Sequence, residues 1–370
     1  PNQICLLYLR SWDMKSNYKQ LGQFIRQVDV RNSEGKEENL LGVSVQKKFI
    51  PSIANTVGTD FKKYKVVKRG QFTYIPDTSR RGDKIGIALL EDYEEGLVSN
   101  VYTVFEIIDE KQLIPEYLML WFSRPEFDRY ARFKSHGSVR EVMDWDEICK
   151  VELPVPPYEK QKEIVDGYKV ITERIALKQK INDNLEEQAI GLYKTEFRAC
   201  KTDEIITGTI SNIGEFVRGK NITAAEMIEG IVPVISAGLQ PSGYHNESNV
   251  SGPSITVSGS GVNAGYVSFH LHDIWAADCS YNNSSKYIHC LYVIMKDIQF
   301  QITELQKGTA QPHVYPKELN PFEISFPKYD VLDRLELHLK KLFSIIEEND
   351  KEILILQQIQ TALLTTLSGR

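Results

Sequence analysis

The chain has 370 residues, of which 42% are hydrophobic and 25% are charged, and its formal net charge is −6. This is the composition of an ordinary globular protein long enough for two domains, and the charge argues against a surface covered throughout by phosphate-binding cations. No run of about eighteen uncharged apolar residues is present, so a membrane span is excluded and no signal peptide is expected.

The five cysteines are scattered and form no Cys-x-x-Cys pair. They are read most simply as reduced cysteines, and a cytoplasmic location is expected.

In chain order, short apolar runs between turn residues predict strands and then helices. In the first half, strands are predicted at residues 64–67, 72–75, 84–88 and 101–105, and helices at 115–122 and 127–133. In the second half, strands are predicted at residues 231–235, 254–257 and 266–269. Each half is therefore predicted to be a strand-rich α+β unit.

The two halves repeat each other at their ends. Residues 137–143 and 151–156 resemble residues 308–314 and 322–327 at a constant separation of 171 positions. A fixed interval of this kind is the signature of a duplicated structural unit, here with pseudo-twofold symmetry.

The beginnings of the two copies also match, because residues 21–26 resemble residues 213–218 at a separation of 192 positions. The first copy therefore holds 21 more residues between its ends, and the interiors have diverged. This pattern predicts a shared frame with an individual specificity in each interior.

A different periodicity follows each copy. After Pro327, residues at alternating steps of three and four predict a coiled-coil helix. These seam positions are Leu332, Leu335, Leu339, Leu342, Ile346, Asn349, Ile353, Leu356, Gln360, Leu363 and Leu367. The equivalent positions of the first copy are Gln161, Ile164, Tyr168, Ile171, Ile175, Lys178, Asn182, Leu185, Ala189, Leu192 and Glu196.

The two helices are predicted to pair with each other in antiparallel orientation. Asn349 and Lys178 occupy equivalent seam positions, where a polar group can fix the register. A helix of roughly 40 residues is about 60 Å long, which is nearly two turns of B-DNA. The helix pair is therefore expected to hold two DNA-binding domains at a fixed separation on one duplex.

The order of these parts resembles the specificity (S) subunit of type I DNA restriction-modification systems. In the first copy the resemblance rests on residues 64–70, 74–76, 96–102, 153–157 and 161–164. In the second copy it rests on residues 218–220, 231–235, 258–266 and 308–315.

The resemblance implies two target-recognition domains separated by two long antiparallel coiled-coil helices. The expected boundaries are residues 1–156 for the first recognition domain, 157–200 for the first spacer helix, 201–327 for the second domain and 328–370 for the second helix. It also implies a non-catalytic subunit that recognises a bipartite sequence in double-stranded DNA.

The implied partners are two modification (methyltransferase) subunits that methylate adenine, and restriction subunits that translocate and cleave DNA. No membrane partner is expected. No cofactor is expected in this chain, because S-adenosylmethionine, Mg and ATP belong to the partner subunits.

Candidate DNA-contacting residues come from basic clusters and from polar loops near the repeat ends. They are Lys63, Lys65, Arg80, Arg81, Lys84, Ser138, Arg140, Arg218, Lys220, Ser258, Ser260, Asn263, Thr309, Gln311 and His313. Arg140 and Gln311 occupy equivalent positions, and Arg suits guanine while Gln suits adenine in the major groove. Base contact and simple bracing of a loop both remain open for these residues, and Arg80, Arg81 and Lys84 fit phosphate contact or a solvated turn.

Other chemistry has little support. Residues 155–158 imitate the Pro-Pro-aromatic motif of amino-methyltransferases, but Val155 cannot bind an amino group. The glycine-rich residues 259–265 are followed by a predicted strand, so they are read as a hairpin and not as a nucleotide loop. His270 and His272 share one side of a strand without further ligands, which does not make a zinc site.

Two other classes of function are weighed against the specificity subunit. A stand-alone methyltransferase or nuclease would need a cofactor loop or a set of metal-binding carboxylates. A coiled-coil adaptor for proteins would lack salt-dependent binding to duplex DNA.

Overall fold

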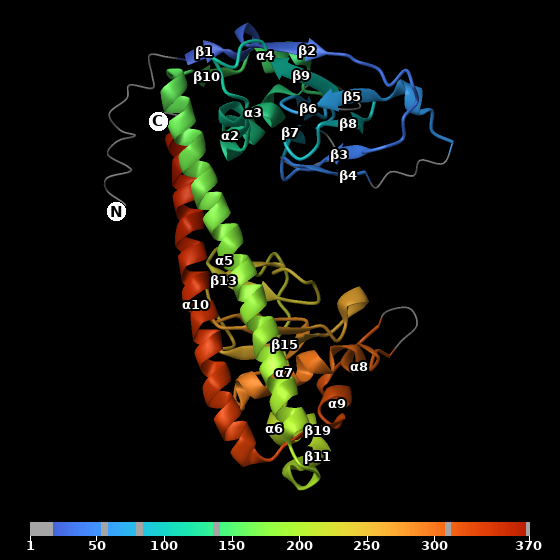
Figure 1. The fold of residues 1–370 in the computed structure, drawn as a ribbon, viewed down its shortest axis with the longest axis vertical. Coiled ribbons are helices and arrows are strands. Elements are labelled where there is room, and N and C mark those ends of the chain that lie inside the picture. The colour runs from blue at the N-terminus through green and yellow to red at the C-terminus, as the bar shows by residue number, and fades with distance from the viewer. Residues whose placement is uncertain (1–17, 53–57, 79–83, 136–140, 308–311, 368–370) are drawn as a thin grey trace. The chain divides into compact units, whose positions relative to one another are not determined.

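The fold is that of a computed structural model, which describes residues 18–52, 58–78, 84–135, 141–307 and 312–367. The chain divides into unit 1, which is Pro1–Ile175 with Ile355–Arg370, and unit 2, which is Ala176–Leu354. Two long helices, α5 (Tyr158–Ala199) and α10 (Tyr329–Thr366), contribute to both units (Figure 1).

Unit 1 places short strands before a group of helices. Its elements before α5 are β1 (Tyr18–Gln20), η2 (Leu21–Gln23), β2 (Ile25–Val28), β3 (Leu41–Val43), β4 (Phe49–Pro51), η3 (Phe61–Lys63), β5 (Lys65–Lys68), β6 (Phe72–Tyr74), β7 (Ile87–Leu89), β8 (Glu95–Val98), β9 (Thr103–Ile107), α2 (Pro115–Phe122), α3 (Pro125–Lys134), α4 (Trp145–Cys149) and β10 (Glu152–Pro154).

Unit 2 follows the same plan. Its elements between the long helices are η4 (Thr202–Glu204), β11 (Ile205–Thr209), α6 (Ile210–Ile213), β12 (Val217–Arg218), β13 (Val232–Ile235), β14 (Gly243–His245), β15 (Ser254–Ser258), η5 (Gly261–Asn263), β16 (Val267–His270), β17 (Trp275–Ala276), β18 (Cys279–Asn282), α7 (Ile288–Asp297), α8 (Gln299–Thr303), α9 (Pro316–Leu319) and β19 (Glu323–Pro327).

The two units share one sheet topology. The central sheet of unit 1 has the strand order β2-β9-β6-β7, and that of unit 2 has the order β12-β18-β15-β16. All neighbours in both sheets are antiparallel. Each unit also pairs the strand before its long helix with an early strand, β10 with β1 and β19 with β11. The duplication read from the sequence is therefore a duplication of the fold, which is α+β in both units.

The smaller sheets differ between the units. Unit 1 adds the pairs β3-β4 and β5-β8, whereas unit 2 adds the three-stranded sheet β14-β13-β17. These additions occupy the interiors whose sequences have diverged, so the frame is common and the insertions are individual.

The helix before the last strand shows how closely the frame is kept. Trp145 begins α4 and Pro316 begins α9, and they are 171 positions apart. Ile148 and Leu319, the apolar residues of these two short helices, are both fully buried. The repeat is therefore maintained by equivalent core positions.

Aromatic residues dominate the core of unit 1. Phe72 of β6 stacks on Phe105 of β9 with the ring centroids 4.9 Å apart, and Phe122 of α2 meets both rings edge-on. Burial of one such side chain stabilises the fold by about 1.5–3 kcal/mol. The helix α2 begins with Pro115 in its first turn, where a proline is favourable, and its predicted bounds are confirmed.

In unit 2 the core joins the sheet to the long helices. Phe216, Ile255 and Leu291 pack in one cluster with Tyr193 of α5 and Phe343 of α10. The seven strands predicted from the sequence are all present, with their ends shifted by up to three residues. The glycine-rich residues 259–265 form the turn between β15 and β16, as the hairpin interpretation predicted.

The two long helices are antiparallel partners within each unit. In unit 1, Gln360 of α10 donates a 2.7 Å hydrogen bond to Thr172 of α5, and in unit 2 Lys178 donates to Asn349 at 2.7 Å. The predicted seam positions are buried or half-buried along both helices, except that Glu196 is exposed while Phe197 packs against the core. No helix in the described part of the chain is long and apolar enough to cross a membrane.

Candidate nucleic-acid interface

One end of the central sheet of unit 2 gathers polar residues from several segments. Arg218 of β12 lies opposite Ser280 of β18, and Ser258 of β15 lies opposite Cys279. Because the strands are hydrogen-bonded in this register, the end of β12, the start of β18 and the end of β15 lie side by side.

A bridge brings a fourth segment to the same place. Ser260 pairs with His313, and the Val314 N–H donates a 3.2 Å hydrogen bond to the Gly259 carbonyl. We call the resulting set the Arg218 cluster; it consists of Arg218, Gly259, Ser260, Asp278, His313 and Tyr315.

The guanidinium of Arg218 is held on two sides. Its Nη2 forms an ion pair with Oδ1 of Asp278, and its central carbon lies 4.5 Å from the centroid of the Tyr315 ring. Oδ2 of the same aspartate accepts a hydrogen bond from Ser260. The Arg218 side chain nevertheless keeps 34% of its surface exposed, so it is fixed and still accessible.

Gly259 is required by this arrangement. A Cβ at this position would lie 2.3 Å from Nη1 of Arg218 and 3.0 Å from the carbonyl oxygen of Asp278. Glycine is the residue that allows the backbone to come this close.

Tyr315 is itself supported by His313. The two rings stack with their centroids 5.2 Å apart, and the Tyr315 hydroxyl lies 3.0 Å from Nδ1 of His313. The aromatic surface under Arg218 is therefore part of a rigid stack, which favours the cation–π contact.

The other predicted residues of unit 2 have separate positions. Ser258 is buried and donates to the Ala237 carbonyl at 3.0 Å, which gives it a structural role. Lys220 is exposed, with its ammonium 5.7 Å from the Trp275 ring. Asn263 is half-buried in η5 beside Val262, whose side chain is 92% exposed.

In unit 1 the described lysines do not converge. Lys65 is buried, donates to the Tyr102 carbonyl at 2.9 Å and pairs with Asp29 at 3.5 Å, so its charge serves the fold. Lys63 is exposed and pairs with Asp60, and Lys84 is exposed at the edge of an undescribed segment. Lys65 therefore has a structural role, as Ser258 does, and neither is a proposed DNA contact.

Six predicted residues lie outside the described residues: Arg80, Arg81, Ser138, Arg140, Thr309 and Gln311. The residues that flank two of these segments are nevertheless joined in unit 1. Asp77 pairs with Val142, and the Thr78 N–H donates to the Glu141 carbonyl at 2.9 Å. The Asp77–Val142 bridge corresponds to the Ser260–His313 bridge of unit 2, because Val142 and His313 are 171 positions apart.

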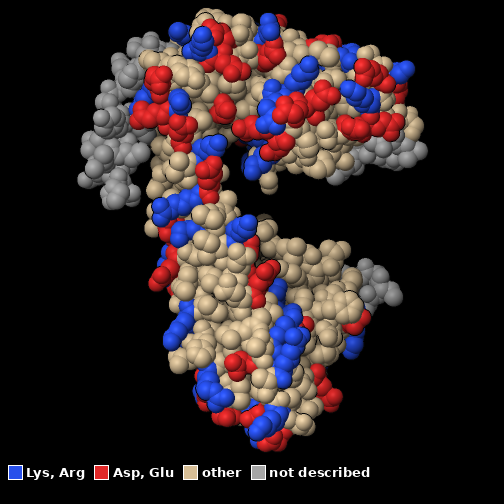
Figure 2. All heavy atoms as spheres, viewed as in Figure 1, with Lys and Arg blue, Asp and Glu red and all other residues tan. Residues whose placement is uncertain are grey.

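The charge on unit 1 is mixed. Figure 2 shows lysine and arginine side chains interspersed with aspartate and glutamate over the face of unit 1 in view. Arg69 pairs with Glu94 at 2.8 Å, and Arg26 pairs with Glu106 at 2.6 Å. The charges of Arg69 and Arg26 are therefore each balanced by an acidic neighbour.

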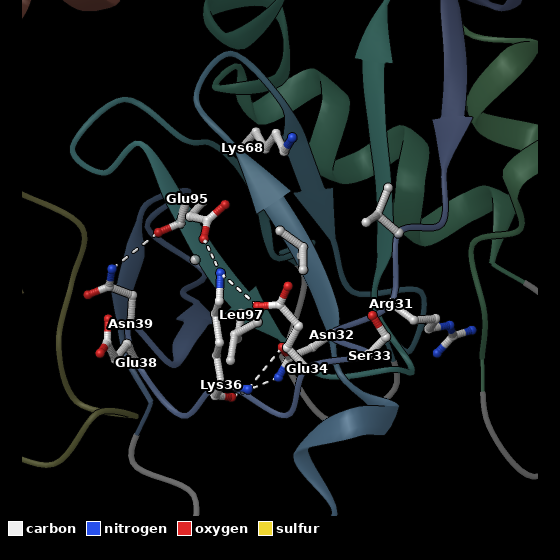
Figure 3. A pocket seen from close by; sticks show the side chains of 13 residues that line it. Arg31, Asn32, Ser33, Glu34, Lys36, Glu38, Asn39, Lys68, Glu95 and Leu97 are labelled. Carbon is white, nitrogen blue, oxygen red and sulfur yellow. Dashed lines mark hydrogen bonds and ion pairs between the residues drawn. The ribbon is translucent and has the colours of Figure 1, made fainter.

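The hollow in Figure 3, about 250 Å³ in volume, shows the same balance. Lys36 lies within 3.3 Å of Glu34 and 3.6 Å of Glu95, and these hydrogen-bonded carboxylates raise the pKa of the Lys36 ammonium. Asn32 closes the loop by donating to the Lys36 carbonyl at 2.7 Å. Lys36, Glu34 and Glu95 thus balance one another, and these contacts hold the loop that forms the wall of the hollow.

A metal centre has no support in the described part of the chain. Among its described residues, no three histidine, cysteine, aspartate or glutamate side chains come together as ligands. The His270 ring forms a 2.8 Å hydrogen bond with the Thr256 hydroxyl, and burial lowers the pKa of this histidine to about 4.

Three members of the Arg218 cluster, Gly259, Asp278 and Tyr315, were not among the residues predicted from the sequence to contact DNA. Asp278 lies between two strands in a segment without any motif, so only the strand register reveals it. Tyr315 follows the repeat motif directly, and its position beside His313 was the available signal.

The repeat and the shared topology correspond to a known family. The family model of the type I restriction modification DNA specificity domain matches residues 15–187 and 203–364, one match for each copy. The chain belongs to this family. The expectation of a DNA-specificity subunit without a catalytic role is thereby confirmed.

Individual members of the family are similar over much of the chain. The specificity subunit of the type I restriction enzyme MjaIX from Methanocaldococcus jannaschii is 24% identical over 307 residues, which cover 70% of each chain. The specificity subunit of the type I restriction enzyme HindI from Haemophilus influenzae is 24% identical over 184 residues, 48% of this chain and 39% of that one.

A solved structure supports the fold assignment. The S subunit of the type I restriction-modification system from M. genitalium superposes with a TM-score of 0.55 and 16% identity, covering 95% of both chains. At this identity the similarity establishes the common fold alone.

Proposed function

We propose that this chain selects the DNA sequence for a type I restriction-modification complex, with each unit reading one half of a bipartite target. The proposal is carried by the duplication: both copies match the specificity-domain family, and both form the same four-stranded sheet. Two similar readers in one chain suit a target with two half-sites.

The contact surface of each unit is proposed to lie at the repeated bridge. In unit 2 this is the Arg218 cluster, with Lys220 nearby on the chain as a phosphate contact. In unit 1 it is the region of the Asp77–Val142 bridge, which adjoins the segments that contain Arg80, Arg81, Ser138 and Arg140. Polar side chains that are fixed by the fold but still accessible suit the reading of base edges.

The long helices are proposed to separate the readers and to bind two modification subunits, which use S-adenosylmethionine to methylate adenine. Restriction subunits, with Mg and ATP, would join the same complex. The expected spacer segments are residues 157–200 and 328–370, close to the observed bounds of α5 and α10.

The test is to express this chain with its cognate modification subunit and to map N6-methyladenine in the host genome by single-molecule sequencing. We expect a bipartite motif with a fixed gap that disappears when this chain is deleted. Unchanged methylation in cells that assemble the complex would contradict the proposal and favour a protein-binding adaptor.

A further inference from the structure

We propose that Arg218 reads a guanine in the half-site recognised by unit 2. This inference rests on the proposed function and extends it to one residue and one base. The Arg218 cluster holds the guanidinium in a way that suits this contact.

The guanidinium of Arg218 is preorganised for binding. A free arginine must lose considerable side-chain entropy before it can donate two parallel hydrogen bonds to a base. Arg218 is already fixed by the Asp278 carboxylate on its edge and by the Tyr315 ring on its face. The carboxylate is in turn fixed by Ser260, and the ring by His313.

Arg218 keeps N–H donors that are not used within the described residues. Asp278 is bonded to Nη2 of Arg218, and within the described residues no hydrogen-bond acceptor is paired with Nη1 or Nε. With 34% of its surface exposed, the side chain can present these donors outward. Nη2 carries two hydrogens and Asp278 accepts one of them, so the other N–H of Nη2 remains parallel to an N–H of Nη1 or to that of Nε. Such a parallel pair matches O6 and N7 of guanine in the major groove, which is the commonest specific contact of arginine.

The negative charge of Asp278 beside Arg218 favours a base edge over a phosphate as the partner. A phosphate that approached Arg218 would also approach the Asp278 carboxylate, which keeps 25% of its own surface exposed. A G·C base pair has no net charge and offers two acceptors beside the N4 amino donor of cytosine. A guanidinium with an adjoining carboxylate therefore fits a G·C edge better than it fits the phosphate backbone.

Gly259 supports the same conclusion. The residue before Ser260 has no side chain, and a Cβ there would collide with Nη1 of Arg218. A larger residue at position 259 would therefore displace the guanidinium from the position in which Asp278 and Tyr315 hold it.

The first experiment uses the unaltered complex of this chain with its modification subunits. Each guanine of the mapped target is replaced in turn by 7-deazaguanine, which keeps base pairing but removes the N7 acceptor, and binding is measured by fluorescence anisotropy. We expect the replacement of one guanine in one half-site to lower the affinity of the complex for the DNA by about 5-fold or more. If no replacement in either half-site lowers the affinity, the inference is overturned. The bipartite motif, and so the proposed function, would remain intact.

The second experiment uses variants in methylome mapping. Arg218→Lys keeps the charge but loses the parallel donors, and we expect the requirement for that guanine to relax by about 5- to 150-fold with the other half-site unchanged. Arg31→Lys is the matched control, because Arg31 is also an accessible arginine paired with a carboxylate, Asp29 at 3.1 Å, with 46% of its side chain exposed, but it is not the repeat counterpart of Arg218. We expect it to leave the motif unchanged.

Two outcomes of the variant experiment would overturn the inference. One is an Arg218→Lys complex that weakens on all sequences alike with an unchanged motif, which is the signature of a phosphate contact. The other is a complex that keeps both its motif and its affinity. If Arg218→Lys does not assemble, Arg218→Gln takes its place, and a 7-deazaguanine series without any response in the unaltered complex still overturns the inference.

Discussion

Lys178 of α5 donates a 2.7 Å hydrogen bond to Asn349 of α10, and the two residues are separated by the same 171 positions as the two copies of the repeat. Equivalent residues of two antiparallel helices meet where a local twofold axis crosses their seam, because each residue then faces its own counterpart. The local axis of this helix pair therefore passes between Lys178 and Asn349. The duplication of the sequence is expressed as a symmetric helix contact.

The first prediction concerns this polar layer. Asn349→Ala removes the acceptor of Lys178 and the donor that reaches Asn182 at 2.8 Å. Lys178 keeps its 2.8 Å ion pair with Glu352, but the half-buried side-chain oxygen of Asn182 loses its donor. An unpaired polar group of this kind costs about 1–3 kcal/mol, so we expect the amides of α10 near this position to exchange hydrogen correspondingly faster. Hydrogen–deuterium exchange of the purified chain measures the effect.

Glu348→Ala is the control for this prediction, because Glu348 lies on the exposed side of the same turn. We expect its effect to stay within about 0.5 kcal/mol. Equal effects from the two variants would contradict a special role for the polar layer.

The second prediction concerns Glu336 of α10, whose carboxylate caps the first turn of α7. Its carboxylate accepts from Nδ1 of His289 at 2.7 Å and from the Cys290 N–H at 2.9 Å. Burial alone would raise the pKa of Glu336, but these hydrogen bonds outweigh burial and lower it. The cap stabilises the ionised form, as expected at a helix N-terminus.

The sign of the pH dependence follows from this lowered pKa. The contribution of Glu336 is fully present above its unfolded pKa of about 4.3 and is lost as the pH falls through the lower folded value. We expect Glu336→Gln to reduce stability at neutral pH by about 1–2 kcal/mol, and the difference from the unaltered chain to shrink below about pH 4. Urea unfolding at a series of pH values measures it.

Asp333→Asn provides the comparison, because Asp333 pairs with Lys286 at 2.6 Å on the exposed surface. Exposed ion pairs contribute little to stability. A Glu336→Gln difference that is constant with pH, or no larger than that of Asp333→Asn, would be evidence against the cap.

The periodic part of the fold could be predicted from the sequence, and the site only partly. The seam of α10 was readable because a helix places residues such as Leu335 and Leu339 on one face by local geometry alone. The meeting of Arg218 with Asp278 depends on the pairing of β12 with β18 across 60 residues, which no local pattern encodes. The same reason explains Lys65, whose burial depends on the distant carbonyl of Tyr102.

The third prediction uses two glycines with opposite surroundings. Gly191 lies in the interior of α5, and no atom lies within 4 Å of the position that a Cβ would take, so Gly191→Ala should stabilise the helix by about 0.5–1 kcal/mol. At Gly208, a Cβ would lie 2.6 Å from Oδ1 of Asn212, which accepts the Thr209 N–H at the start of α6. Gly208→Ala should therefore destabilise, and thermal unfolding distinguishes the two signs.

The fourth prediction concerns Lys220, the proposed phosphate contact. Lys220→Gln removes a cation whose ammonium is exposed beside Trp275. We expect weaker binding to all DNA sequences alike, an unchanged methylation motif, and a plot of log affinity against log salt that is shallower by about 0.9. A changed motif would show that Lys220 reads a base instead.

The fifth prediction tests whether Gly259 acts through Arg218. The Cβ of Gly259→Ala would displace Nη1 of Arg218, which lies 2.3 Å from its position, so the guanidinium would lose its fixed orientation. We expect this variant to relax the same base of the target as Arg218→Lys does, and the double variant to be no worse than either single one, because both changes remove one interaction. Methylome mapping of the three complexes measures this, with the other half-site as the internal control for assembly. Additive losses, or relaxation at a different base, would mean that Gly259 supports DNA recognition by another route.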